Sequence, residues 1–166
     1  DIDPVAINVA QVIAQSNPRL KGLVTLRLQT DANAVFRNII KSDDYFDLTI
    51  CNPPFHASRA DAAEANQRKR SRLNKGAISE RGSNQGTEMA SPLNFGGQNH
   101  ELWCSGGELG FLSRMLAESA EFSQQVYCFT SLVSKAENIS PLKKLLSRLG
   151  ATQTAVVETS QGQKIS

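Results

Sequence analysis

Residues 45–55 read YFDLTIC followed by NPPF, and this stretch decides how the chain is interpreted. Tyr45 to Cys51 is a short run rich in apolar residues, which is typical of a strand. Asn52-Pro53-Pro54-Phe55 follows directly, and Asn-Pro is a turn initiator. Because open α/β sheets bind their ligands at the carboxyl ends of strands, the tetrapeptide stands where a functional site is expected.

The residue types of this tetrapeptide suit chemistry on an exocyclic or amide nitrogen. Such a nitrogen is a poor nucleophile because its lone pair is delocalised. The Asn52 side-chain oxygen and the Pro53 carbonyl can accept its two N–H groups, which favours a more tetrahedral nitrogen. Pro54 fixes the turn, and Phe55 offers a flat face for a flipped-out base. The alternative is that Asn-Pro-Pro forms only a loop.

Helical and strand-like patterns alternate along the rest of the chain. Asp3 is an N-cap with proline after it, and Gly150 ends a later helix. The alternation predicts an α/β fold with a mostly parallel, doubly wound sheet. The expected helices are 4–16, 33–41, 107–122 and 140–149, and the expected strands are 23–29, 45–51, 126–133 and 154–158.

The chain has 166 residues and 40% hydrophobic content, enough for one domain or part of one. It shows neither an apolar run of membrane-spanning length nor a signal-peptide pattern, so we expect a soluble, cytoplasmic protein. The three cysteines are far apart and odd in number, which predicts buried free thiols rather than a disulfide or a metal site.

A polar loop at about 56–98 holds the positive charge of the chain. Residues 58–98 carry seven basic and four acidic side chains. Ordering on RNA through phosphate contacts is one interpretation, and a solvated loop without a specific role is the other. The candidate RNA-binding residues are Arg59, Arg68, Lys69, Arg70, Arg72, Lys75 and Arg81.

Several motifs together resemble a known family. They are DIDP at 1–4, NPPFH at 52–56, NFGG at 94–97, SGGELGF at 105–111 and CFTSLVSK at 128–135. The combination is similar to class I S-adenosylmethionine-dependent adenine-N6 methyltransferases. The more specific likeness is to the bacterial 23S ribosomal RNA enzymes and their eukaryotic methyltransferase-like relatives. This resemblance implies a Rossmann-like sheet.

The resemblance also implies roles for individual residues. Asp1 would bind the ribose hydroxyls of S-adenosylmethionine, and Thr30 and Asp31 would lie beside its adenine. Asn52, with Pro53, Pro54 and Phe55, would hold the target amine during direct in-line transfer to an adenosine of 23S ribosomal RNA. Two alternatives stay open: a protein glutamine-amide methyltransferase, and an RNA-binding module without catalysis.

The chain departs from the family pattern at its start. It begins at the acid that ends the second strand, and the glycine-rich loop after the first strand is absent. We therefore expect residues 1–166 to be part of one methyltransferase domain, and the isolated piece to be inactive.

Gly106-Gly107 either approaches a ligand closely or packs at a helix start.

Overall fold

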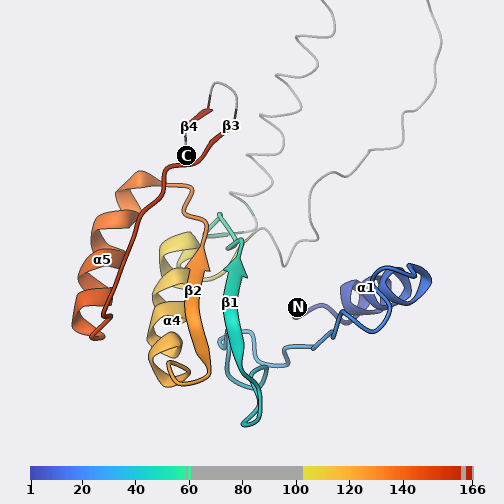
Figure 1. The fold of residues 1–166 in the computed structure, drawn as a ribbon. Helices are drawn as coiled ribbons and strands as arrows, with labels where there is room; N and C mark the ends of the chain where they lie inside the picture. Colours follow the sequence, from blue (N-terminus) through green and yellow to red (C-terminus); the bar gives the residue numbers. More distant parts are fainter. Residues whose placement is uncertain (59, 61–102, 162–163, 166) are drawn as a thin grey trace, which may run out of the picture.

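The computed structural model describes residues 1–58, 60, 103–161 and 164–165. Two parallel strands, β1 (Phe46–Cys51) and β2 (Val126–Ser131), lie side by side, and α4 (Gly107–Glu121) connects back to β2. Figure 1 shows α4 and α5 (Ile139–Arg148) on the β2 side, whereas α1 (Pro4–Ser16) lies beyond β1. Two short elements, β3 (Ser160–Gln161) and β4 (Lys164–Ile165), form an antiparallel hairpin.

The core lies between one face of this sheet and the two helices behind it. Leu112 and Met115 of α4 pack with Leu142 of α5 and with Phe36 from the turn before β1. The Phe36 ring lies 5.3 Å from that of Phe129 in β2. Burial of these side chains joins the strands, both helices and the 33–41 segment into one packed unit.

Three helices follow the sequence signals closely. The Asp3 side chain accepts the backbone N–H of Val5 at 2.8 Å and caps α1, as predicted. Helix α4 spans nearly the expected residues. Helix α5 begins slightly earlier than expected, after the short helix η1 (Ala136–Asn138), and Gly150 follows its end with a φ of 77°.

Three other expected elements are wrong. Residues 33–41 form turns instead of a short helix, with Asn38 at a φ of 67°. Residues 23–29 and 154–158 contain no strand within the described chain. Alternating side chains do not make a strand unless the backbone finds a ladder partner. Within the described chain, the backbone of 23–29 bonds to Asp1 through Arg27 and Gln29 and to the preceding turn through Leu23, so no ladder forms.

The apolar character of residues 126–133 favours a buried strand, but β2 is mostly exposed or half-buried, with Val126 as its one buried residue. On the face of the sheet away from Phe129, Leu48 is 49% exposed and Ile50 85% exposed, because no described residue forms a second layer over them. The cysteines are free, as predicted, but Cys128 is exposed and Cys51 and Cys104 are only half-buried. Among the described residues, no helix combines the length and apolar character that crossing a membrane requires.

Candidate active site

The Asn52–Phe55 motif follows β1 at the carboxyl edge of the parallel pair. Pro53 is one of the most completely buried side chains, Pro54 and Phe55 are half-buried, and Asn52 is exposed. Within the described chain, the Asn52 amide has no hydrogen-bond partner. A buried proline thus anchors the turn, while the amide beside it remains available to a ligand.

Backbone hydrogen bonds hold the motif on both sides. Before it, the Cys51 carbonyl accepts the N–H of Leu132 at 2.9 Å, just after β2. After it, the His56 carbonyl accepts the N–H of Cys104 at 3.1 Å, in an isolated parallel bridge between His56 and Trp103. The turn is therefore fixed by two segments that are distant in sequence, which suits a preorganised site.

The start of α4 packs directly against the end of the motif. Gly106 and Gly107 have φ angles of 81° and 60°, in the left-handed region. A Cβ atom on Gly107 would lie 3.4 Å from the Cβ of Ala57. Of the two interpretations of Gly106-Gly107, the structure supports packing at a helix start. The indole Nε1 of Trp103, whose backbone pairs with His56, is buried and has no hydrogen-bond partner among the described residues.

Glu108, in the first turn of α4, joins this helix to the loop after β2. Only 2% of the residue is exposed, and its carboxylate accepts hydrogen bonds from Ser134 N at 2.7 Å, Lys135 N at 3.3 Å and Asn138 Nδ2 at 2.6 Å. Desolvation raises the pKa of Glu108, but the hydrogen bonds from Ser134, Asn138 and Lys135 outweigh it and lower the pKa below its ordinary value. The buried carboxylate is therefore ionised at neutral pH.

The predicted cofactor residues lie on two neighbouring segments. The N–H of Gln29 donates to the Asp1 carbonyl at 2.7 Å, which places Asp1 beside the segment that carries Thr30 and Asp31. All three candidates are exposed. Their carboxylate and hydroxyl oxygens can accept hydrogen bonds from the ribose hydroxyls or the adenine amine, so these acceptors fit S-adenosylmethionine. No described hydrogen bond joins them to Asn52, and their roles stay predictions.

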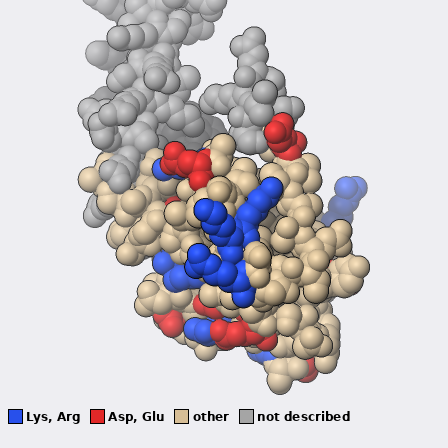
Figure 2. Space-filling model, turned by 90° about the vertical axis from the view of Figure 1, so that its left-hand side faces the viewer, with Lys and Arg blue, Asp and Glu red and all other residues tan. Residues whose placement is uncertain are grey.

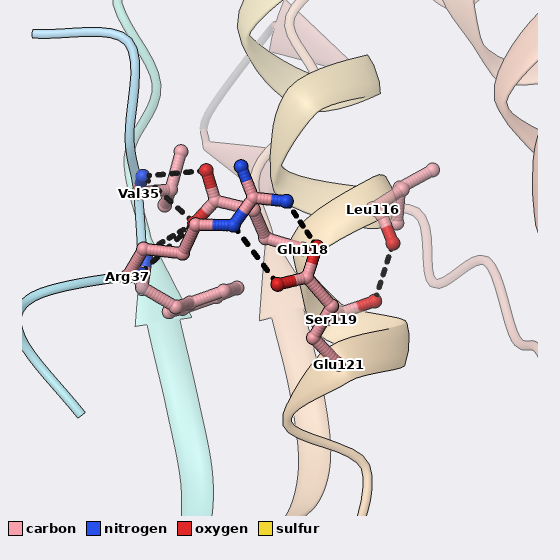
Figure 3. A network of polar contacts seen from close by, with 7 residues as sticks. Val35, Arg37, Leu116, Glu118, Ser119 and Glu121 are labelled. Carbon is pink, nitrogen blue, oxygen red and sulfur yellow. Dashed lines mark hydrogen bonds and ion pairs between the residues drawn. The ribbon is translucent and has the colours of Figure 1, made fainter. Parts of the chain in front are cut away.

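A buried glutamate secures the turn behind this pair of segments (Figure 3). Glu118 of α4 accepts the backbone N–H groups of Val35, Phe36 and Arg37 at 2.7–3.1 Å. One helical turn on, Glu121 forms an exposed ion pair with Arg37. The buried Gln29 side chain links the same turn to the cofactor segment, because it donates to the Arg37 carbonyl and accepts the N–H of Asp31.

The seven cations predicted to bind RNA, from Arg59 to Arg81, lie outside the described residues. A different group of basic side chains is exposed on the α5 side of the molecule (Figure 2). None of them has an ion-pair partner among the described residues, and the one acidic residue between them in sequence is Glu137. We call this group the α5 basic face; it consists of Lys135, Lys143, Lys144 and Arg148.

Sequence reasoning missed Glu108, Asn138 and Glu118, because their partners lie 26 to 83 residues away. A glutamate on the apolar side of a helical pattern was the available signal. No cluster of three or more possible metal ligands occurs in the described part of the chain, and no metal site was predicted.

Comparisons with known proteins agree with this fold. A family model described as RNA methyltransferase matches residues 1–166, and the chain belongs to this family. The class I, Rossmann-like α/β fold predicted from the sequence is confirmed by solved structures. The catalytic domain of hMettl16 in complex with MAT2A 3′UTR hairpin 1 matches with a TM-score of 0.69 at 21% identity, covering 99% of this chain and 51% of that one.

Similar curated proteins carry a common name. Ribosomal RNA large subunit methyltransferase F of Desulfotalea psychrophila is 53% identical over 166 residues, covering 100% of this chain and 51% of that protein. The protein of the same name from Psychrobacter sp. (strain PRwf-1) is 49% identical over 169 residues, covering 100% of this chain and 52% of that protein. The chain spans about half the length of the curated relatives it matches.

Proposed function

We propose that a protein containing this chain methylates the exocyclic N6 of an adenosine in 23S ribosomal RNA, with S-adenosylmethionine as methyl donor. The observation that carries the proposal is the placement of Asn52–Phe55 at the carboxyl edge of β1, held on both sides by backbone hydrogen bonds. Membership of an RNA methyltransferase family and the names of the relatives support the substrate class. A ribosomal RNA substrate implies a cytoplasmic reaction.

The residues of the motif would act by holding the adenine amine. The exposed Asn52 side-chain oxygen and the Pro53 carbonyl would accept its two hydrogens, which keeps the nitrogen lone pair free for attack. Phe55 would stack on the flipped base. Because the acceptors are fixed before the substrate arrives, little reorganisation is needed in the transition state.

The cofactor would be held by Asp1, Thr30, Asp31 and Asn52. When bound, S-adenosylmethionine supplies a methyl group activated by its sulfonium. The two carboxylates would accept ribose and adenine hydrogens, and the Gln29–Asp1 hydrogen bond keeps the two segments together. The buried Gln29 side chain accepts the N–H of Asp31 and donates to the Arg37 carbonyl, and Glu118 holds the turn that carries Arg37.

RNA would contact two basic regions. The first is the loop that carries Arg59, Arg68, Lys69, Arg70, Arg72, Lys75 and Arg81. The second is the α5 basic face, which starts at Lys135 in the loop after β2 and therefore begins at the same sheet edge as the motif. Cations without carboxylate partners are available for phosphate contacts.

The proposal is tested by methyl transfer from radiolabelled S-adenosylmethionine. In separate reactions, a polypeptide of the relatives' length that contains this chain is incubated with unmodified 23S ribosomal RNA, which is then digested to nucleosides, and with unmodified ribosomal proteins, which are digested to peptides. The expected product is labelled N6-methyladenosine. Label on glutamine amides of ribosomal proteins would favour the protein methyltransferase, and RNA binding without any transfer would favour the binding module. Either outcome would overturn the proposed reaction.

A further inference from the structure

Two loops leave the parallel strands at the same edge of the sheet. One follows β1 and carries Asn52–Phe55, and the other follows β2 and covers residues 132–138. The first turn of α4 contacts both. This arrangement makes the start of α4 a shared support for the two loops (Figure 1).

The contact with the first loop is close and depends on glycine. The ideal Cβ position of Gly107 lies 3.4–3.5 Å from three atoms of Ala57, and the neighbouring Cys104 N–H donates to His56. A shift of the helix start would therefore move the chain immediately after Phe55.

The contact with the second loop depends on one carboxylate. Glu108 accepts two backbone N–H groups and the Asn138 amide, and it is almost completely buried. Within the described chain, no other acceptor serves the N–H groups of Ser134 and Lys135. Loss of the carboxylate would leave these donors without a partner, so the loop would have to move to find water.

The two loops are also tied to each other. Leu132, at the start of the second loop, donates to the carbonyl of Cys51, which directly precedes Asn52. The motif is thus held at one end through the second loop and at the other end through the segment leading into α4. Glu108 and Gly107 connect these two supports from adjacent positions.

We propose that Glu108 is a positioning residue for methyl transfer. Its buried carboxylate fixes the loop after β2 against α4. Through the hydrogen bond from Leu132 to the Cys51 carbonyl, this loop keeps the side-chain oxygen of Asn52 and the carbonyl of Pro53 in place. Asn138 assists as the side-chain donor of the same cluster. This inference rests on the proposed function, since it concerns the motif that would hold the adenine amine.

The test compares Glu108→Gln with the double variant Glu108→Gln/Asn138→Asp in a polypeptide of the relatives' length. Glutamine places an amide NH2 group among the donors Ser134 N, Lys135 N and Asn138 Nδ2. In the double variant this NH2 group can donate to the carboxylate at position 138, which restores one hydrogen bond with reversed direction. We expect Glu108→Gln to lower kcat per folded molecule about 10- to 100-fold with an unchanged KM for RNA, because small misplacements of catalytic groups have effects of that size. The double variant should recover part of kcat. Glu121→Gln, on the exposed side of α4, is the matched control and should leave kcat unchanged.

Two results would overturn the proposal: a normal kcat per folded molecule in Glu108→Gln despite lower stability, or a loss that the double variant does not repair. If Glu108→Gln does not fold, Asn138→Ala keeps the backbone bonds and should give a smaller loss of kcat. Hydrogen exchange of the Ser134 and Lys135 amides tests the support without using activity. Faster exchange in a folded variant is expected, and unchanged exchange would contradict it. A wild-type protein that lacks N6 transfer would refute the proposed function. The exchange result would still test whether Glu108 holds the loop after β2, because it needs no activity.

Discussion

Replacing Glu118 with glutamine tests how the turn behind the cofactor segment is held. The carboxylate accepts three consecutive backbone N–H groups, at 2.7 Å for Phe36 and at 3.0–3.1 Å for Val35 and Arg37. Only 3% of Glu118 is exposed, so water does not replace these bonds. A hydrogen bond to a charged acceptor stabilises by about 1.5–3 kcal/mol and a neutral one by about 0.5–1.5 kcal/mol.

Losing the charge on a shared acceptor should therefore reduce the free energy of unfolding by about 1–3 kcal/mol. In urea denaturation followed by circular dichroism, this corresponds to a midpoint about 1 M lower. Glu121→Gln is the matched control, because Glu121 lies on the same helix and pairs with the same turn through the exposed Arg37 (Figure 3). Its effect should be much smaller, since exposed ion pairs are screened by solvent. Equal effects of the two substitutions would refute the reasoning.

Two further outcomes follow from charge placement. The hydrogen bond from Arg27 lowers the pKa of Asp44 to about 2, so this carboxylate should stabilise the fold above about pH 4 and lose that contribution as the pH falls toward 2. Asp44→Asn should remove this part of the pH dependence in denaturation measured from pH 6 to 2, and an unchanged profile would contradict it. Replacing Lys143, Lys144 and Arg148 with serine should weaken RNA binding and reduce the salt slope by up to about one unit per lost phosphate contact. The same change at the exposed Arg19 and Lys21, which follow α1, is the control. An unchanged slope would show that the α5 basic face does not touch RNA.

Elements with strong local signals were predictable from the sequence. The Asp3 cap with Pro4 marks α1, and the apolar run before Asn52 marks β1. The Asn-Pro-Pro turn then places the motif at the sheet edge. These features depend on residues next to one another, so local propensity is enough to find them.

The parts that failed depend on distant partners. Residues 33–41 have a helical pattern, but Glu118 binds three of their N–H groups from about 80 residues away and favours turns. The support by Glu108 is hidden for the same reason, because its partners follow a different strand. Residues 23–29 alternate as a strand would, yet alternation says nothing about which backbone pairs with them.

The most direct test of the proposed chemistry is the single-turnover rate of methyl transfer with Asn52→Ala. The protein is saturated with RNA and S-adenosylmethionine in a polypeptide of the relatives' length, and Asn8→Ala on the exposed side of α1 is the control. We predict a rate at least about 100-fold lower for Asn52→Ala even at saturating S-adenosylmethionine, because one preorganised polar contact to the amine is lost. A near-normal rate would contradict amine activation by the Asn52–Phe55 motif.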